Sequence, residues 1–462
     1  MTQRPLSLWV PPVATSAPAE WPTADAASGA QPWLGLLCVC LAGYATFGKA
    51  WAYVGIAPVY VGEIVLLCGA VAALVAGKWH GIFDVTTVRL LVALAAWGAF
   101  RTVPFFSTYG ADALRDAAVW GYGAYAVVVF AYLAAVPQRL PLLLRRYRQF
   151  IPILLCGVSI VVPVAQFVDP AWRWWPASDQ PIKGADVLVQ LAGVVAFWSS
   201  QWGGPASWVW LVVLTLNVAF IGLMDRSGLV SFLAVLGVCF ALSPRSRTLP
   251  RIALLTVFAV AALWLSGLRI ELQGGGGKTR ELSFDFLVAS MRSVTSDVGD
   301  TGLDSTKEWR LDWWGEIVDY TLGGRFFWTG KGFGVNLADD DGFQVSQEHA
   351  LRSPHSVHMT FLARAGVPGL VLWLATQLAF GAAMWSSYLR ARRRGDDRWA
   401  GVFLFLGAFW MAFLINGSFD VFIEGPVGGI WFWTIFGAGL AAARIYRVCP
   451  QVLFADEHHR CA

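Results

Sequence analysis

The sequence predicts an all-α polytopic membrane protein, with about twelve transmembrane helices and one long outer loop that contains short helices. The 462-residue chain is 57% hydrophobic and only 14% charged, whereas a soluble domain is about 25% charged. Apolar stretches long enough to cross roughly 30 Å of hydrocarbon recur along nearly the whole chain. They show no strand-like alternation, and backbone groups inside a bilayer find no water, so these stretches are expected to be helices.

The same composition excludes other classes of protein. A soluble chain of this length would need far more charged surface, and the 14% aromatic content excludes a disordered one. The 34 basic and 30 acidic residues leave a net charge of only +4, which gives no sign of a nucleic-acid partner. Membrane lipids are the expected surroundings.

From the N-terminus, the segments divide the chain into five regions. Residues 1–32 are rich in Ala, Pro and Ser and lack the basic start of a signal peptide, so we expect a disordered tail. Nine helices are expected within 33–268, a large outer loop over 269–356, three helices within 357–446 and a cytoplasmic tail over 447–462. The expected spans are 33–49, 58–77, 86–104, 114–136, 149–168, 185–200, 205–222, 227–243, 250–268, 357–386, 399–416 and 428–445.

Basic residues predict the orientation, because Lys and Arg near span ends mark cytoplasmic loops. Each group of arginines follows an even-numbered span: Arg139, Arg145, Arg146 and Arg148; Arg245, Arg247 and Arg251; Arg390, Arg392, Arg393, Arg394 and Arg398; Arg444 and Arg447. Both termini are therefore expected in the cytoplasm. The segment from Leu268 to Pro354 is then outside, with helix-like stretches at Ser283–Val294 and Ser305–Leu322.

Three arginines remain at the outer face of this topology. Arg115 opens the fourth span, Arg226 opens the eighth, and Arg310 lies in the long outer loop. Guanidinium groups present paired donors that match phosphate oxygens, so together they suit a lipid-linked phosphate or diphosphate. The alternative is that each arginine only pairs with its own sequence neighbour, which would be Asp116, Asp225 or Asp312.

His355 stands where the outer loop enters the tenth span. A histidine at this edge, near arginines, is a candidate general base toward a sugar hydroxyl. It could instead form a metal site with His349 and His358, or be a solvated structural residue. The seven cysteines, five of them in spans, show no CxxC spacing and indicate neither a disulfide framework nor a zinc site.

Four motifs carry a resemblance to a known family. They are Asp225-Arg226-Ser227-Gly228-Leu229; Trp309-Arg310-Leu311-Asp312-Trp313-Trp314 with Gly330-Lys331-Gly332-Phe333-Gly334; His355-Ser356 leading to Gly366-Val367-Pro368-Gly369-Leu370; and Phe419-Asp420 with Glu424-Gly425-Pro426. In order and spacing they resemble the O-antigen ligase and O-antigen polymerase superfamily of bacterial membrane glycosyltransferases. The chain departs from that pattern at Asp225, Ser356 and Arg364, where the family more often has Ser, Asn and an acidic or neutral residue.

The resemblance implies a metal-independent, inverting glycosyltransferase of the bacterial cytoplasmic (inner) membrane, without a cofactor. Its donor would be an undecaprenyl-diphosphate-linked glycan, and its acceptor a glycan or a lipid-linked saccharide, for assembly of surface polysaccharide. Arg226 and Arg310, with Arg115, would hold the diphosphate, and His355 would orient or deprotonate the attacking hydroxyl.

Two other functions stay open from the sequence. A secondary transporter also has about twelve spans, but it tends to show internal repeats and ionisable residues near mid-membrane, and neither is evident here. A structural membrane protein without catalysis would require no convergence of Arg226, Arg310 and His355.

Overall fold

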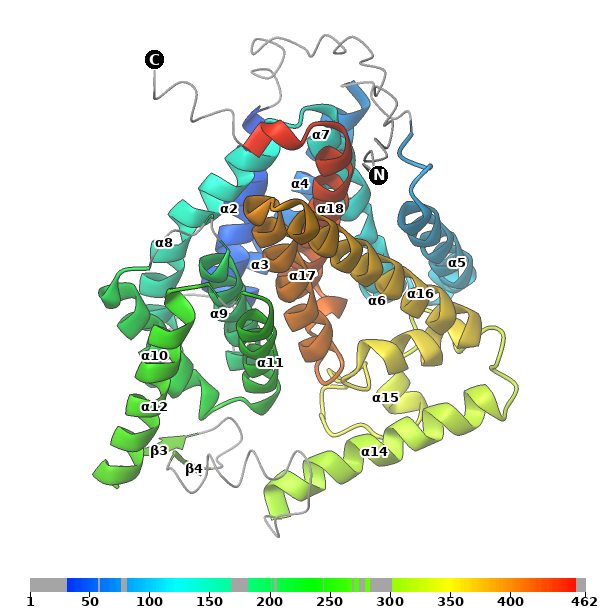
Figure 1. The fold of residues 1–462 in the computed structure, drawn as a ribbon. Helices are drawn as coiled ribbons and strands as arrows, with labels where there is room; N and C mark the ends of the chain where they lie inside the picture. The colour runs from blue at the N-terminus through cyan, green and yellow to red at the C-terminus, as the bar shows by residue number, and fades with distance from the viewer. Residues whose placement is uncertain are drawn as a thin grey trace, which may run out of the picture.

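The computed structural model describes residues 31–453, except 57–58, 76–80, 168–181, 201, 203–205, 244, 268–269, 274–278 and 283–300. The described part is almost entirely helical (Figure 1), which confirms the all-α prediction. The predicted N-terminal tail, the stretch Ser283–Val294 and most of the C-terminal tail lie outside the described residues.

The elements follow one another along the chain with few strands. The helices are α2 (Gln31–Phe47), α3 (Lys49–Ala52), α4 (Val61–Val75), α5 (Thr86–Tyr109), α6 (Ala111–Gly121), α7 (Gly123–Ala135), α8 (Arg139–Phe167), α9 (Gly184–Ser199), α10 (Trp208–Gly222), α11 (Arg226–Leu242), α12 (Thr248–Ser266), α14 (Thr301–Leu322), α15 (Leu337–Asp340), α16 (Val357–Arg394), α17 (Asp397–Gly417), η2 (Phe422–Glu424), α18 (Pro426–Val448) and η3 (Pro450–Leu453). Two antiparallel hairpins are present, β1 (Gly55–Ile56) with β2 (Val59–Tyr60) and β3 (Ile270–Gln273) with β4 (Thr279–Leu282).

Each of the twelve predicted spans coincides with one helix or, for residues 114–136, with the pair α6 and α7. By length and apolar composition, six described helices can cross a membrane, or seven if that pair, bent by 44°, is one span. The five remaining segments, α2, α4, α9, α10 and α11, are shorter apolar helices. The structure is therefore that of a polytopic membrane protein, but helix length does not confirm twelve crossings.

Helices α17 and α18 form the centre of the bundle (Figure 1). Helix α18 packs against α7, and α17 packs against α9, α11 and α16. Their side chains join one continuous apolar core, in which large aromatic residues such as Phe409 and Trp431 are buried. Segments from both halves of the sequence thus enclose the same interior.

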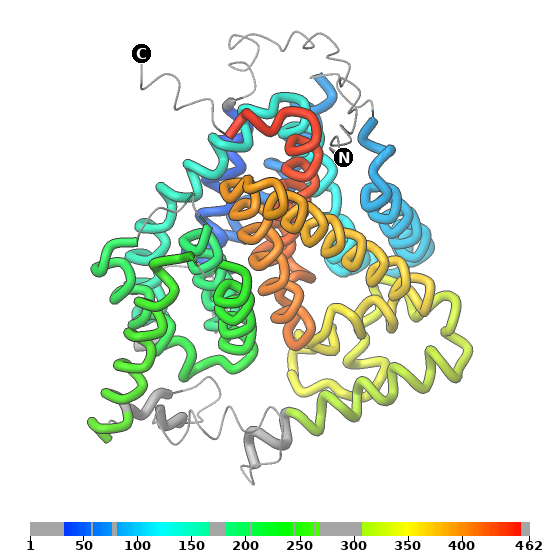
Figure 2. The backbone as a smooth tube through the Cα atoms, viewed as in Figure 1, coloured from blue at the N-terminus to red at the C-terminus, as the bar shows by residue number. Residues whose placement is uncertain are grey.

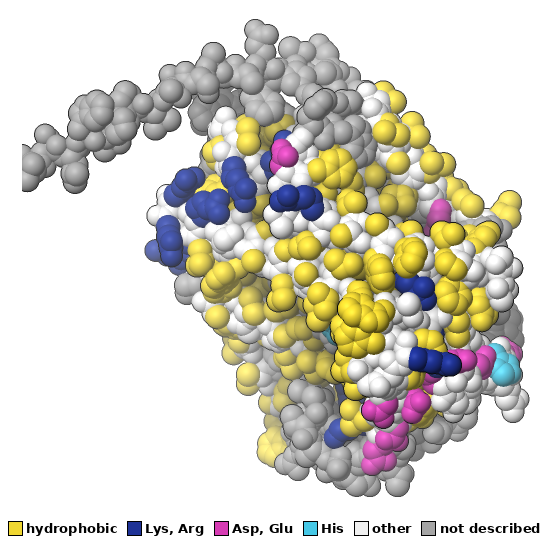
Figure 3. Space-filling view, turned by 90° about the vertical axis from the view of Figure 1, so that its right-hand side faces the viewer, with side chains coloured by type: hydrophobic (Ala, Val, Ile, Leu, Met, Phe, Trp, Pro, Cys, Tyr) yellow, Lys and Arg dark blue, Asp and Glu magenta, His cyan; other side chains and the backbone are white. Residues whose placement is uncertain are grey.

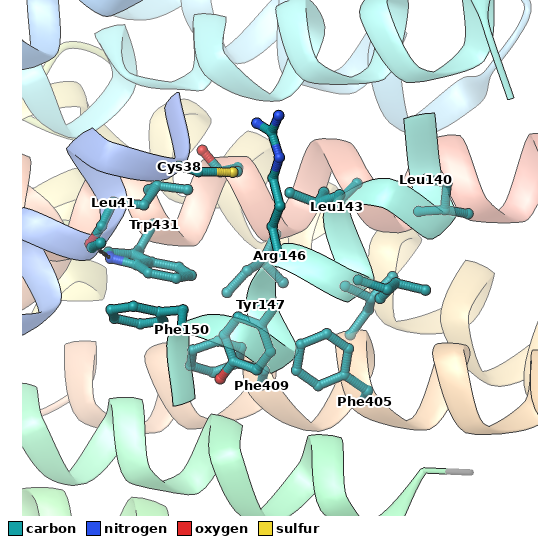
Figure 4. A pocket seen from close by; sticks show the side chains of 16 residues that line it. Cys38, Leu41, Leu140, Leu143, Arg146, Tyr147, Phe150, Phe405, Phe409 and Trp431 are labelled. Atoms are coloured by element: carbon teal, nitrogen blue, oxygen red, sulfur yellow. Dashed lines mark hydrogen bonds between the residues drawn. The ribbon is translucent and has the colours of Figure 1, made fainter. Parts of the chain in front are cut away.

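A small cavity in this core is apolar. Its volume is about 70 Å³, and α2, α8, α17 and α18 line it. Figure 4 shows the rings of Tyr147, Phe150, Phe409 and Trp431 among the lining side chains, while the side chain of Arg146 points away from them. A lining of this kind favours packing rather than polar chemistry.

The outer loop forms a second, smaller core beside the bundle. Helix α14, which confirms the predicted stretch Ser305–Leu322, lies across the lower end of the bundle (Figures 1 and 2). Buried side chains from α14, α15 and the start of α16 pack together, namely Trp313, Ile317, Leu337, Ala338, Leu362 and Ala363. The loop is therefore anchored to the first turns of α16.

Part of this loop, residues 327–332, packs against a break in α16. Gly366 has φ +69°, and a side chain there would meet the Phe327 carbonyl oxygen at 2.6 Å. The break leaves backbone carbonyls unpaired, and the loop supplies donors to them: Lys331 N–H to Ala363 O at 2.7 Å and Gly332 N–H to Arg364 O at 3.0 Å. This explains why glycines are required in the loop motif, and it fixes the start of α16.

The two ends of the bundle differ in charge. On the face in Figure 3, most Lys and Arg side chains gather at the upper end and most Asp and Glu side chains at the lower end. This asymmetry agrees with the orientation that the positive-inside rule predicts. We refer to these as the arginine-rich end and, because it is the end predicted to face outward, the outer end.

Candidate functional site

A buried carboxylate, Asp420, joins three distant segments at the outer end. It lies in the turn between α17 and η2. The Lys183 ammonium, just before α9, donates to Asp420 Oδ1 and Oδ2 at 2.9 and 3.1 Å. His355 Nδ1, just before α16, lies 3.5 Å from Asp420 Oδ1. Asp420 therefore holds a lysine and the predicted catalytic histidine at one point.

The charges in this cluster stabilise one another. Burial alone would raise the pKa of Asp420, but the adjacent His355 and Lys183 outweigh it and lower that pKa. Burial likewise opposes the charge of Lys183, yet Asp420 and Asp186 raise its pKa above the ordinary value. Asp420 is accordingly a carboxylate at neutral pH, and Lys183 is its ammonium partner.

His355 is held in an unusual backbone conformation. Its φ is +55°, which is uncommon for a residue with a side chain. The ring lies 6.2 Å, centroid to centroid, from Trp309 of α14. On the same helix, Trp314 Nε1–H donates to Pro354 O at 2.7 Å and fixes the residue before His355. Strain of this kind persists where surrounding contacts impose it and is common at functional sites.

Arg310 reaches the same turn from α14. Its Nη1–H donates to Phe419 O, the residue before Asp420, at 3.1 Å. It also lies within electrostatic range of Asp420 and Asp225. The guanidinium is thus directed away from α14 into the cluster, which the alternative of pairing with Asp312 alone does not explain.

Arg226 begins α11 at a place where the starts of α9 and α11 pack closely. It is the first residue of α11, directly after Asp225. A side chain at Gly228 would meet Ala185 Cα of α9 at 2.6 Å, so the glycine permits this approach. Asp225 lies within electrostatic range of Asp420 and Lys183, and burial together with the Asp420 charge raises its pKa.

Arg115 lies at the margin of the site. It is exposed on α6 and within electrostatic range of Lys49, which also interacts with Lys183 and Asp420. Its sequence neighbour Asp116 pairs with two other arginines: Asp116 Oδ2 lies 2.8 Å from Arg364 Nη1 and 2.9 Å from Arg352 Nη2. The structure therefore brings Arg310 and His355 to one carboxylate and places Asp225, the residue before Arg226, within electrostatic range of it. Arg115 lies farther out.

A polar network behind the site supports it. Arg364, where the chain departs from the family pattern, is buried and donates to Val335 O and Arg352 O at 2.9 and 3.1 Å. Glu424 of η2 accepts a hydrogen bond of 2.9 Å from Thr360 Oγ1. Burial raises the pKa of Glu424 to about 7 although Ser353 and Thr360 donate to it. Glu424 thus ties the segment after Asp420 to α16, and Arg364 ties α16 to the loop residues Val335 and Arg352.

Some polar atoms in the cluster have no hydrogen-bond partner among the described residues. They are Asp186 Oδ1 and Arg310 Nε, both buried, while His355 Nδ1 has only the longer contact of 3.5 Å with Asp420 Oδ1. Unpaired buried polar atoms are rare in folded proteins and call for an explanation such as a ligand. Such atoms also occur elsewhere in the described bundle, and those beside the ion-paired Asp420 mark this cluster as the candidate site.

The alternative of a three-histidine metal site finds no support in the described residues. His349 lies beside Asp339, at 2.7 Å, and His358 Nε2 lies 3.0 Å from Ser418 Oγ. Trp373 Nε1–H donates to the other ring nitrogen of His358 at 3.0 Å. Within this part of the chain, no group of three or more His, Cys, Asp or Glu is placed to hold a metal ion.

Sequence reasoning missed Lys183 and Asp186, and gave Asp420 no role. Lys183 precedes an apolar span on the outer side, where the positive-inside rule does not require a lysine. Asp186 lies within that predicted span, where an ionisable residue is costly and usually functional. Those two signals were available in the sequence, but the partnership between residues 183 and 420 was not.

Comparison with known protein families supports the resemblance found in the sequence. Residues 210–374 match the family described as O-Antigen ligase. The matched region contains Arg226, Arg310 and His355, while Lys183 and Asp420 lie outside it. No curated protein matches the chain significantly. The match confirms the resemblance to the O-antigen ligase and polymerase superfamily, and it supports a membrane ligase or polymerase of the O-antigen type.

Proposed function

We propose that this protein is an inverting membrane glycosyltransferase that acts at the outer face of the bacterial cytoplasmic membrane. It transfers a glycan from an undecaprenyl-diphosphate carrier to a saccharide or lipid-linked acceptor. The observation that carries the proposal is the arrangement around Asp420, where His355 lies 3.5 Å away and Arg310 donates to the preceding carbonyl. A base and a phosphate-binding group are thus neighbours, as glycosyl transfer from a diphosphate requires.

The arginines bind the diphosphate in this proposal. Arg310 keeps its buried Nε–H unpaired among the described residues, which leaves a donor for a phosphate oxygen. Arg226 lies at the start of α11, where the helix N-terminus also favours an anion. Arg115 contributes from the exposed margin. As the anomeric bond breaks, these charges stabilise the leaving diphosphate.

His355 accepts the proton of the acceptor hydroxyl. With Nδ1 toward Asp420, the other ring nitrogen, Nε2, is the one available to the hydroxyl. The acceptor oxygen attacks the anomeric carbon from the face opposite the diphosphate, a new glycosidic bond forms, and the bond to the diphosphate oxygen breaks. The electron pair leaves with undecaprenyl diphosphate, and the Asp420 carboxylate stabilises the imidazolium.

The reaction needs no metal or cofactor in this scheme, because arginines supply the positive charge. Purified protein is therefore expected to keep its full rate in a chelator. Loss of activity that a divalent ion restores would overturn this part of the proposal.

An assay with purified protein tests the function. The donor is an undecaprenyl-diphosphate glycan, and the acceptors are lipid A core, a second lipid-linked repeat, an exopolysaccharide fragment and a hydroxyl-bearing peptide. A glycosidic product with one of them supports the proposal and identifies the acceptor. If no acceptor is glycosylated and vesicles containing the protein instead move the precursor across the bilayer, the protein is a transporter.

A further inference from the structure

A second cavity, lined by polar as well as apolar residues, lies at the opposite end of the bundle from the candidate site. Its volume is about 300 Å³, and it lies between the ends of α9, α11 and α16 and the starts of α12 and α17. Lys183 precedes the first residue of α9, whereas Ser199 and Ser200 at its other end line the cavity. The 16 residues of α9 separate the two places by about 24 Å. The cavity is therefore distinct from the site around Asp420.

Positive charge exceeds negative charge in this cavity. Three arginines line it, Arg245, Arg247 and Arg392, against the single carboxylate of Asp397. Asp397 is shared by Arg392 Nη1 at 2.6 Å and Arg245 Nη1 at 3.5 Å. Arg247 makes no ion pair with any residue that the structure describes. An excess of two positive charges thus faces the cavity.

The rest of the lining does not cancel this charge. Ser199 and Ser200 donate their hydroxyl hydrogens to Val195 O and Phe197 O, and Ser243 donates to Ser199 O. Their hydroxyls are fixed and neutral. Helix α12, 19 residues long, begins at the rim with no side-chain cap on its first turn. The free N–H groups of that turn add to the attraction for an anion.

The position of the cavity indicates the kind of anion. It lies at the arginine-rich end, which the positive-inside rule places at the cytoplasmic surface. The apolar side chains of Trp198, Leu242 and Leu404 form part of its wall. Beside it, α12 presents exposed apolar residues such as Val257 and Phe258. Basic pockets between transmembrane helices at this surface bind anionic lipid headgroups.

We propose that this cavity binds a phosphate group, at a site separate from the proposed transferase centre. Arg247 and Arg245 are the principal ligands, and Arg392 remains paired with Asp397. Arginines at this surface ordinarily only fix topology. Here the arginines instead line a cavity large enough for a phosphate headgroup. This cavity is the reason to assign them a binding role in addition to their effect on membrane orientation.

The test measures binding of defined probes to the full-length protein in detergent. Native mass spectrometry compares dioleoylphosphatidylglycerol with zwitterionic dioleoylphosphatidylcholine, and calorimetry measures inorganic pyrophosphate. We expect the doubly substituted Arg245→Gln/Arg247→Gln protein to bind the anionic probe about 30-fold more weakly than wild type. The matched control, Arg390→Gln/Arg393→Gln, removes the same charge from the same end outside the cavity and should bind within about twofold of wild type.

The outcomes separate the sources of phosphate. Arginine-dependent binding of phosphatidylglycerol without pyrophosphate identifies a lipid headgroup, and arginine-dependent binding of pyrophosphate identifies a free phosphate compound. Equal binding of both lipids, or equal loss in both double variants, overturns the proposal. If the double variant does not fold, the exposed Arg247→Gln alone provides the same comparison.

Discussion

Replacing Asp420 by Asn is the sharpest perturbation of the candidate site, since it removes one charge and little volume. At the observed 3.5 Å separation, the attraction between this carboxylate and a protonated His355 is about 5 kcal/mol at an effective dielectric constant of about 20. Lys183 neutralises part of the carboxylate's charge, and His355 keeps some contact with water. We therefore expect a loss of about 2–3 kcal/mol in the transition state, which lowers kcat about 30- to 160-fold.

The substitution has a second consequence that needs its own control. Asp420→Asn leaves the mostly buried Lys183 without its partner, which destabilises the fold by about 3 kcal/mol. The double variant Asp420→Asn/Lys183→Met removes both charges, so its thermal stability should recover while its kcat stays low. Measuring transfer rates at saturating donor, together with thermal unfolding, separates the catalytic effect from the structural one.

A matched carboxylate is available elsewhere in the outer loop. Asp339 lies 2.7 Å from His349, both more exposed than Asp420 and His355. Asp339→Asn makes the same chemical change beside a histidine outside the cluster and should leave kcat unchanged. If Asp420→Asn keeps kcat within about threefold of wild type, or if Asp339→Asn is equally impaired, the reasoning about the His355 environment is refuted.

Three further predictions concern packing, charge and pH. Gly228→Ala should push α11 away from α9 and lower both activity and the unfolding temperature. Gly237→Ala in the same helix should do neither, because a Cβ there would meet no atom within 4 Å. Equal effects of the two substitutions would contradict the packing argument. Arg310→Ala should raise the KM for the donor and lower kcat at least about tenfold. Arg325→Ala in the same loop should change neither constant. Unchanged kinetics of the Arg310→Ala protein would exclude Arg310 from diphosphate binding. Because burial raises the pKa of Glu424 from 4.5 to about 7, its contribution to stability is complete below pH 4.5 and is lost as pH rises through 7, by about 3 kcal/mol. The unfolding temperature of wild type should therefore fall between pH 5 and 8 more than that of Glu424→Gln, and equal slopes would contradict the assignment.

Much of the fold was predictable because a bilayer imposes strong rules on sequence. Every predicted span became a helix or a bent pair, since apolar segments must satisfy their own backbone in hydrocarbon. The number of crossings was less predictable, because helices of 15 to 17 residues such as α4 and α11 are apolar but short. The break at Gly366 was also hidden, because its cause is a loop that packs from outside the helix.

The candidate site was predictable only in part. Arg226, Arg310 and His355 stood out because charged residues are scarce and these lie in motifs at the predicted outer face. Lys183 and Asp420 are 237 positions apart, so only the fold makes them partners. In the sequence, Arg364 is only a departure from the family pattern. The structure shows that it is buried and donates to Val335 O and Arg352 O, which indicates a structural role.

One measurement tests the central claim most directly. Purified wild-type protein and the His355→Ala variant are supplied with an undecaprenyl-diphosphate glycan and the acceptor identified in the assay described above. The amount of undecaprenyl diphosphate released is compared with the number of new glycosidic bonds. The account predicts one carrier released for each bond formed by wild type, and neither product from His355→Ala that is correctly inserted and folded. Wild-type amounts of both products from His355→Ala would contradict it.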